Sequence, residues 1–111
     1  MKHCLTLNLK SDSKLITEYE IWHSPENIPK EIIEGIYSIG IKEMEIFRWE
    51  NRLFMIIETE NDFDWDTQMK RLSEIPGQKE WEIQMDLYQE RISNKEKWVK
   101  MQNIFKLTNC K

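Results

Sequence analysis

Cysteine, glycine and histidine are scarce in this chain of 111 residues, which holds two Cys, three Gly and two His. The thiols Cys4 and Cys110 stand near opposite ends, and their spacing indicates neither a disulfide framework nor a zinc-ligand cluster. The stretches around Gly35 and Gly40 lack the Gly-x-Gly spacing and the Lys-Ser/Thr ending of a phosphate-binding loop. We therefore expect no metal site and no cofactor.

Long apolar runs are missing as well, since no stretch approaches the roughly 20 residues that a membrane-spanning helix needs. Lys2, Lys10 and Lys14 interrupt residues 1–20, which excludes the apolar centre of a secretory signal. Free thiols without such a signal are typical of a reducing compartment. We expect a cytoplasmic protein with no membrane partner.

Positive charge is in the minority, because 16 Lys and Arg face 20 Asp and Glu and give a formal net charge of −4. A chain of this charge does not offer the basic face that nucleic acids attract, so nucleic-acid binding is not expected. The acidic residues are dispersed along the chain, as on an ordinary solvated surface, and they indicate no special partner.

The composition itself is that of an ordinary globular protein, with 40% hydrophobic and 32% charged residues. The length suits a single domain over residues 1–111 with a small hydrophobic core. Five Trp, four Phe and three Tyr must either fill this core or line a binding site. Aromatic rings often contact sugars, so their number favours a sugar site slightly.

Hydrophobic periodicity predicts one strand and two helices in the first part of the chain. Alternating leucines indicate a strand over residues 3–9, and Asp12 or Ser13 then offers a helix N-cap. Five side chains of this first helix share one face: Leu15, Ile16, Tyr19, Trp22 and His23. After two prolines the helical period resumes over residues 30–39, and Gly40 suits a C-terminal cap.

A hairpin is predicted in the middle of the chain. Residues 42–49 alternate between apolar and polar side chains, and residues 52–59 form a dense apolar strand. The Glu50-Asn51 pair between them suits a tight turn, because Asn tolerates positive φ.

The last part of the chain is predicted as two helices, a loop and a strand. Helical spacing covers residues 62–73 and 78–92, with a Pro-Gly pair between the two segments. Residues 93–97 are polar and indicate a loop. Residues 99–107 return to alternation and predict a closing strand.

The predicted order is strand, helix, strand, strand, helix, strand, with each helical segment broken once. This order is that of the ferredoxin-like split βαβ plan, an α+β fold in which helices cover one face of an antiparallel sheet. The other face would then stay open, as a pocket, a dimer contact or both.

Four separated motifs occur in order along the chain: Tyr19-x-x-x-His23; Gly40-Ile41 followed by Ile46-Phe47; Trp81-x-x-x-Met85; and Trp98-Val-Lys-Met101-Gln-Asn-Ile-Phe105-Lys-Leu107. Together these motifs resemble the pattern of the L-rhamnose mutarotase family, and the resemblance runs from about residue 3 to residue 107. Each motif is weak alone, and the specificity lies in their order and spacing.

The resemblance implies a fold, an assembly and an activity. Its fold is a dimeric α+β barrel, so a homodimer is expected, and its members interconvert the anomers of L-rhamnose or related free monosaccharides such as L-fucose. By position, His23 would be the acid and base of catalysis, Tyr19 would hold the sugar and Trp81 would form an apolar wall. Met44 is expected to contact the substrate, and Met44 or Met85 could receive the methyl group of a 6-deoxy sugar.

The chain departs from the family pattern at three places. Met44 stands where many members have a second Tyr, and Glu82 replaces the second residue of a Trp-Trp pair. The family's Trp-Pro-Glu after the histidine is replaced by Ile28-Pro29-Lys30-Glu31. Because of these changes, the sequence does not determine which sugar is the substrate. It also allows an alternative function, that of a non-catalytic dimeric barrel that binds a small ligand.

The proposed chemistry needs only a group that exchanges a proton near neutral pH, which histidine provides. Tyr19 lies one helical turn before His23, so the two side chains are neighbours.

From the residues alone, His23 could equally cap or pack a helix end, Tyr19 could be a core residue, and Trp81 could belong to a buried stripe. His3 is expected at the surface or a sheet edge. A dimeric barrel of the antibiotic-monooxygenase type would share the fold but not the Tyr-x-x-x-His pattern.

Overall fold

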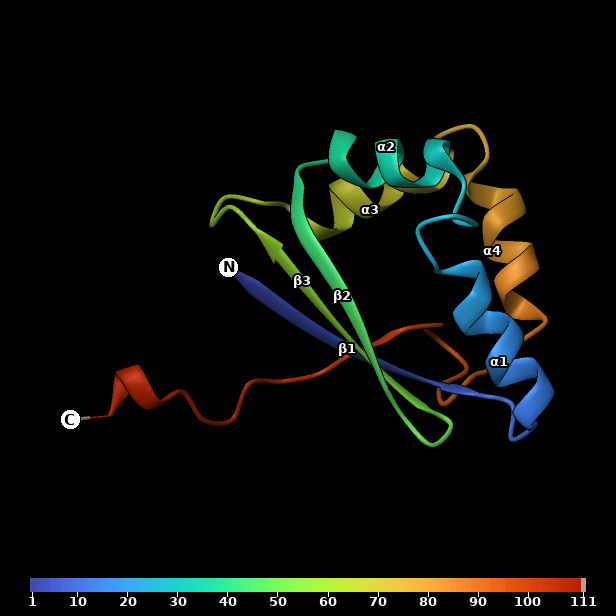
Figure 1. Ribbon diagram of the computed structural model, residues 1–111. Helices are drawn as coiled ribbons and strands as arrows, with labels where there is room; N and C mark the ends of the chain where they lie inside the picture. Colours follow the sequence, from blue (N-terminus) through green and yellow to red (C-terminus); the bar gives the residue numbers. More distant parts are fainter. Residues whose placement is uncertain (111) are drawn as a thin grey trace.

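The computed structural model describes residues 1–110, in which four α-helices lie on one side of an antiparallel sheet (Figure 1). The elements in chain order are β1 Lys2–Leu9, α1 Ser13–Trp22, α2 Lys30–Ser38, β2 Ile41–Trp49, β3 Arg52–Thr59, α3 Trp65–Glu74, α4 Gln78–Asp86, β4 Gln89–Glu90, β5 Val99–Lys100 and the short 3₁₀ helix η1 Leu107–Asn109. Among residues 1–110, no helix has the length and apolar character needed to span a membrane.

The sheet has the strand order β2-β3-β1-β4, with β5 also paired to β1. All pairings are antiparallel, and the register sets Leu7 opposite Leu53 and Ile46 opposite Met55. This topology confirms the predicted α+β fold with helices on one face. It arises because alternate residues of β1 and β3 are apolar and are buried beneath the helices.

Local signals in the sequence fix most element ends. The Asp12 side chain accepts hydrogen bonds from the backbone N–H groups of Lys14 and Leu15 and so caps α1. Gly40 follows α2 with a φ of +95°, in agreement with its predicted role. The turn between β2 and β3 is also confirmed, although the residue with positive φ is Glu50, at 51°, and not Asn51.

Two predictions for the end of the chain are wrong. The helix predicted over 78–92 ends at Asp86, because Gln89–Glu90 forms β4 and hydrogen-bonds to the end of β1. Tyr88 is buried beneath this turn, which gave the sequence its helical spacing. The strand predicted over 99–107 pairs only at Val99–Lys100, which lie opposite Thr6 and Leu5 of β1. Its apolar residues Ile104, Phe105 and Leu107 are exposed.

β4 and β5 occupy the same side of β1 and form one interrupted strand. Leu9 pairs with Gln89, whereas Leu5 pairs with Lys100, so the sheet pairing resumes after residues 91–98 have left it. The predicted loop at 93–97 lies within this interruption. Residues 91–98 place Glu96 and Trp98 at the space between the sheet and the helices.

The hydrophobic core is divided into two clusters beneath the helices. The first is centred on Leu5, Met55 and Ile57, and the second on Leu9 and Tyr19. Ile46 and Trp98 are partly buried against both clusters. The two clusters therefore flank a shared space, which the side chains described below enclose.

The opposite face of the sheet carries Phe47 and Trp49, which are 51% and 68% exposed. Their register partners on β3 are Phe54 and Arg52, which share this face. An exposed patch with two large aromatic side chains is typical of a contact surface.

The expectation that His3 lies at the surface is wrong. His3 is buried, its Nε2 lies 3.0 Å from Thr59 Oγ1, and its ring packs against Phe63 and Trp65. The reason is its parity on β1, which it shares with Leu5 and which points it toward α3.

Candidate functional site

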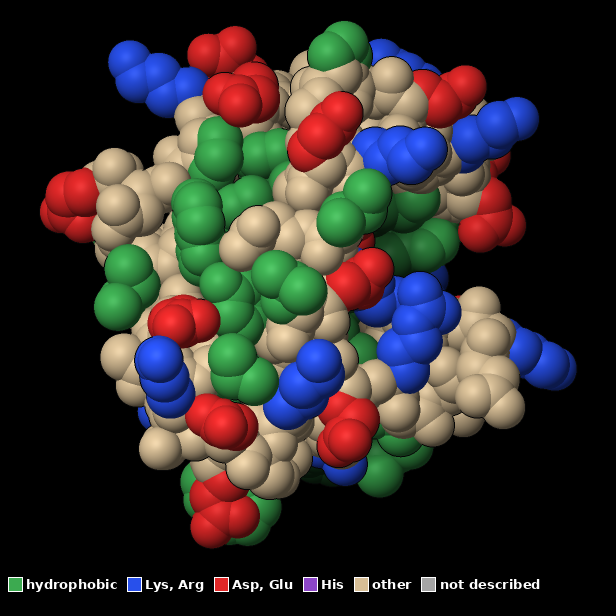
Figure 2. All heavy atoms as spheres, turned by 90° about the vertical axis from the view of Figure 1, so that its right-hand side faces the viewer, with side chains coloured by type: hydrophobic (Ala, Val, Ile, Leu, Met, Phe, Trp, Pro, Cys, Tyr) green, Lys and Arg blue, Asp and Glu red, His purple; other side chains and the backbone are tan. Residues whose placement is uncertain are grey.

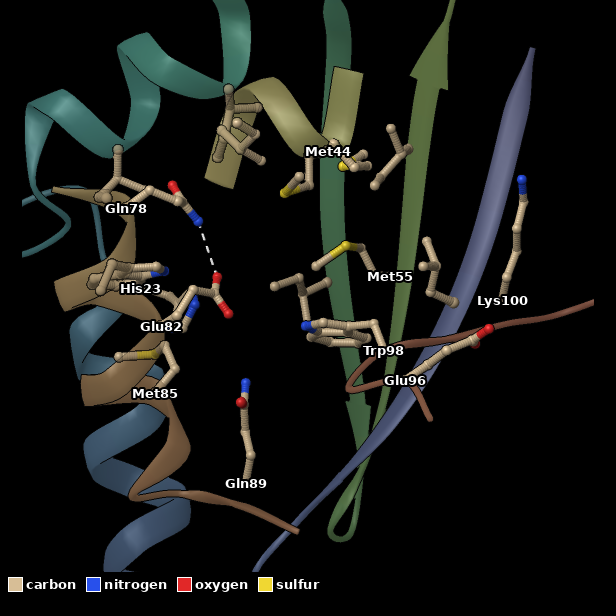
Figure 3. A pocket seen from close by; sticks show the side chains of 18 of the residues that line it. His23, Met44, Met55, Gln78, Glu82, Met85, Gln89, Glu96, Trp98 and Lys100 are labelled. Atoms are coloured by element: carbon tan, nitrogen blue, oxygen red, sulfur yellow. Dashed lines mark hydrogen bonds between the residues drawn. The ribbon is translucent and has the colours of Figure 1, made fainter. Parts of the chain in front are cut away.

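A cavity of about 640 Å³ lies between the helix-covered face of the sheet and the helices. Figure 3 shows its two walls, with α1 and α4 on one side and the strands on the other. Volumes of this order are usual for small-molecule sites. The four residues predicted as site residues, His23, Tyr19, Trp81 and Met44, all line this cavity.

His23 stands at the C-terminal cap of α1, where the helix ends and the side chain turns to the cavity (Figure 3). Its Nδ1 lies 2.8 Å from the backbone oxygen of Tyr19. A carbonyl oxygen only accepts, so Nδ1 carries the hydrogen and Nε2 keeps a free lone pair. Burial lowers the pKa of His23, and the hydrogen bond to Tyr19 raises it in part, so the ring is neutral near pH 7.

Tyr19 lies one turn earlier on α1 and packs its ring against His23, with 4.3 Å between ring centroids. Burial raises the pKa of Tyr19 to about 12; the adjacent Gln89 side chain lowers it in part, and the charge of Glu82 raises it. The phenol therefore keeps its proton at neutral pH and can donate a hydrogen bond.

Trp81, on α4, completes the aromatic group around the imidazole. Its ring meets His23 edge-on, with 5.4 Å between centroids, and meets Trp22 in the same way at 6.2 Å. Such edge-to-face contacts fix the orientation of a ring. The structure thus brings the predicted Tyr19, His23 and Trp81 together, with His23 serving both as a helix cap and as part of the cavity wall.

The wall facing these residues is mostly apolar, although Glu96 and Lys100 also line the cavity on this side (Figure 3). Figure 3 shows Met44, Met55 and Trp98 on the strand side, across the cavity from His23. Met44 and Met55 come from β2 and β3, and Trp98 comes from the interruption between β4 and β5. A cavity with one polar and one apolar wall matches a sugar ring, whose hydroxyl edges and C–H faces differ in the same way.

Glu82 was not predicted as a site residue, yet its carboxylate points into the cavity from α4 (Figure 3). Its Oε1 accepts from Gln78 Nε2 at 2.9 Å, and its Oε2 accepts from Lys97 Nζ at 2.7 Å. Lys97 also pairs with Asp86 at 2.9 Å. The available signal was the departure from the Trp-Trp pair, which marked a polar residue at a site position.

Gln89 was missed because the sequence placed it in a helix. It lies instead on β4, is 8% exposed and lines the cavity. Among residues 1–110, its Oε1 has no hydrogen-bond partner. A buried acceptor without a donor is costly, which makes it a candidate for contact with a ligand.

Over the described part of the chain, no three His, Cys, Asp or Glu side chains come together as a metal-binding group. The titratable groups at the cavity are those of proton transfer and hydrogen bonding: an imidazole, a phenol, carboxylates and the ammonium group of Lys100. Their arrangement suits acid–base chemistry on a small polar molecule.

A family model described as L-rhamnose mutarotase matches residues 2–107. Among curated proteins, an L-fucose mutarotase of Xanthomonas campestris pv. campestris is 39% identical over 61 residues, which cover 55% of this chain and 49% of that protein. A UPF0734 protein of Dictyostelium discoideum is 47% identical over 58 residues, covering 52% of this chain and 45% of that protein. The chain thus spans about half the length of the curated relatives it matches.

Two solved structures share the fold. An L-rhamnose mutarotase from Formosa agariphila superposes with a TM-score of 0.70 at 17% identity, covering 96% of this chain and 98% of the other. Tetracenomycin F2 cyclase from Streptomyces glaucescens superposes with a TM-score of 0.61 at 14% identity, covering 96% of this chain and 95% of the other. At these identities the superpositions establish the architecture only, because one fold carries many activities.

Proposed function

This chain belongs to the L-rhamnose mutarotase family, and from that premise we propose that it interconverts the α and β anomers of a free 6-deoxy sugar. The substrate would be L-rhamnose or a relative such as L-fucose. The observation that carries the proposal is the convergence of His23, Tyr19 and Trp81 on one cavity.

The proposed mechanism opens and recloses the sugar ring by proton transfer. Nε2 of His23 takes the proton of the anomeric hydroxyl, the bond between the anomeric carbon and the ring oxygen breaks, and the imidazolium so formed returns the proton to the ring oxygen. Rotation about the next carbon–carbon bond and the reverse steps give the other anomer. Tyr19, a neutral phenol, would donate a hydrogen bond to the ring oxygen as charge develops there.

The apolar wall accounts for a preference for a deoxy sugar. The methyl group of a 6-deoxy pyranose would pack against Met44, and Trp81 would cover a C–H face of the ring. Met44→Ala should then lower the preference for L-rhamnose over L-mannose, its 6-hydroxy counterpart. An unchanged preference would remove Met44 from the proposal.

The activity can be tested by saturation-transfer NMR on anomerically equilibrated sugar. Added protein should speed the exchange between the two anomeric signals of L-rhamnose or L-fucose above the rate in buffer. If exchange stays at the buffer rate with L-rhamnose, L-fucose and other deoxy sugars, the proposed activity is wrong.

A second function, binding without turnover, is favoured by Met44 and Glu82, which replace a Tyr and a Trp of the family pattern. In that case the chain would bind a sugar and leave its anomer exchange at the buffer rate. His23→Ala would separate the two functions, because it would abolish exchange in an enzyme while a binding protein has none to lose.

We also propose that the chain is a homodimer. Support comes from Phe47 and Trp49 on the uncovered face of the sheet, and from the exposed tail beyond β5, where Ile104 is 93% exposed. Surfaces of this kind in small domains usually contact a second copy.

The proposed site of action is the cytoplasm, where the free thiols Cys4 and Cys110 would stay reduced.

A further inference from the structure

Glu82 is held so that part of its hydrogen-bonding capacity stays available. A carboxylate offers about four acceptor positions, and within residues 1–110 Gln78 and Lys97 occupy one on each oxygen. Glu82 lines the cavity, and its carboxylate points into it (Figure 3). The side chain of Lys97 is 14% exposed and also pairs with Asp86, so the geometry of the carboxylate is fixed from behind.

Gln89 adds an independent observation. Its side chain points into the same cavity from β4 (Figure 3), and its Oε1 finds no donor among residues 1–110. Leaving such an acceptor unsatisfied costs about 1–3 kcal/mol. A ligand hydroxyl group would satisfy it, whereas an apolar ligand would leave the cost in place.

Glu82 and Gln89 line the same cavity as Tyr19 and His23. Tyr19 in turn packs against His23. The two acceptors therefore share one cavity with the residues proposed for proton transfer.

We propose that Glu82 and Gln89 are specificity-determining residues that accept hydrogen bonds from two hydroxyl groups of the sugar ring. This inference rests on the proposed function and refines it. The site selects a pyranose that keeps these ring hydroxyls, and it rejects analogues in which either is replaced by hydrogen. At Gln89 the missing hydroxyl leaves a buried acceptor unpaired. At Glu82, whose side chain is 45% exposed, it removes a hydrogen bond to a charged group.

The test measures the dissociation constants of L-rhamnose and of its 2-, 3- and 4-deoxygenated analogues by NMR titration of the full chain. For the unsubstituted chain, we expect removal of the hydroxyl that faces Glu82 to weaken binding by about 10-fold or more, as for hydrogen bonds to charged groups. Glu82→Gln should erase most of this difference, because the amide no longer offers a charged acceptor.

Asp86→Asn is the matched control, because Asp86 binds the same Lys97 from the same helix but does not line the cavity. It should leave the preference among the analogues unchanged. If Asp86→Asn lowers the preference as much as Glu82→Gln does, Glu82 acts only as an anchor for Lys97 and the inference is wrong.

Gln89→Met separates binding from folding. A role in packing alone predicts unchanged sugar affinity, whereas the inference predicts weaker sugar binding together with an unchanged or higher Tm, since the variant removes an unsatisfied acceptor. If L-rhamnose binds and both Glu82→Gln and Gln89→Met keep the preferences of the unsubstituted chain, the inference fails and the proposed function stands. If no sugar binds and no exchange is accelerated, both fail.

Discussion

His23 has two ring nitrogens with different tasks. Nδ1 donates to the Tyr19 backbone and holds the ring in place, which leaves Nε2 to exchange a proton with a ligand. Histidines with one nitrogen anchored in this way keep a fixed tautomer, so proton transfer needs no rearrangement of the ring.

The role of the free nitrogen can be tested with His23→Asn. The Asn side chain keeps an N–H donor near the helix end but lacks the second nitrogen, so anomer exchange should fall by about 10²–10⁴-fold while the helix stays capped. Saturation-transfer NMR measures the rate, and circular dichroism checks the fold. Exchange at the unsubstituted rate would assign His23 a structural role only.

The pH dependence of exchange follows from the lowered pKa of His23, whose ordinary value is 6.5. Because the neutral ring is the proton acceptor, the rate should be constant above pH 6.5 and should fall only as the pH drops through the lowered value. The same shift makes the folded state bind fewer protons than the unfolded state between the lowered pKa and 6.5, so stability is lost as the pH falls from 6.5 toward the lowered value. Rates and urea midpoints measured from pH 8 to pH 4.5 check both; a rate midpoint above 6.5 would contradict the assignment.

At the residue scale, the sequence predicts some of the residues that line the cavity but not all of them. Tyr19, His23 and Trp81 could be predicted, because helical spacing and family motifs both point to them. Gln89 could not, because burial of Tyr88 imitates a helical period across a segment that is a strand. The burial of His3 follows from strand parity, because His3 lies on the same face of β1 as Leu5.

At the scale of elements, the ends of the helices decide where the site residues stand. α1 ends at Trp22, which places His23 at the cavity, and α2 ends before Gly40, whose φ of +95° turns the chain into β2. Side chains other than Gly are strained in this backbone region.

Gly40→Ala should therefore destabilise the fold by about 1–2 kcal/mol, the cost of a left-handed conformation for a residue with a Cβ. The added Cβ would meet only Phe63, at 3.8 Å, so the cost lies in the backbone. Gly35→Ala is the control, because Gly35 lies inside α2 and its Cβ would make an ordinary 3.5 Å contact with Ile75. That variant should be more stable by about 0.5–1 kcal/mol. Denaturant unfolding measures both, and an equal change in both variants would refute the argument.

The closing strand shows why the final elements resisted prediction. Its alternation of apolar residues continues to Leu107, but pairing depends on a neighbouring strand and not on the pattern alone. Within this chain the neighbour is β1, and only two residues of the segment reach it as β5. The apolar residues beyond β5, Ile104, Phe105 and Leu107, stay exposed.

At the scale of the whole molecule, two exposed apolar faces of the folded domain are candidates for the contact of the proposed dimer. One is the uncovered sheet face with Phe47 and Trp49. The other is the outer side of α1 and α4, where Figure 2 shows hydrophobic side chains among charges of both signs, and where Ile83 is 58% exposed. The sheet face carries the larger aromatic side chains, and aromatic residues are enriched in interfaces.

Substitution of Trp49 by Lys should therefore dissociate the dimer, because a charge would be buried without a partner. Ile83→Lys, at a similarly exposed apolar position, should leave the dimer intact. Size-exclusion chromatography with light scattering gives the mass of each variant. A dimer that survives Trp49→Lys and is lost with Ile83→Lys would move the interface to the helices.

Between β4 and β5, different residues stabilise the sheet and shape the cavity. β4 and β5 pair with β1, whereas residues 91–98 between them contribute to the cavity. Hydrogen-bonded pairing resumes on β1 whatever residues 91–98 contain, while Lys97 and Trp98 of that segment help to set the cavity's charge and shape. Substitutions in this segment that keep Trp98, which packs against both hydrophobic clusters, can consequently alter which ligand is accepted with little loss of stability. The remainder of the segment is the natural place to randomise when a new substrate is sought.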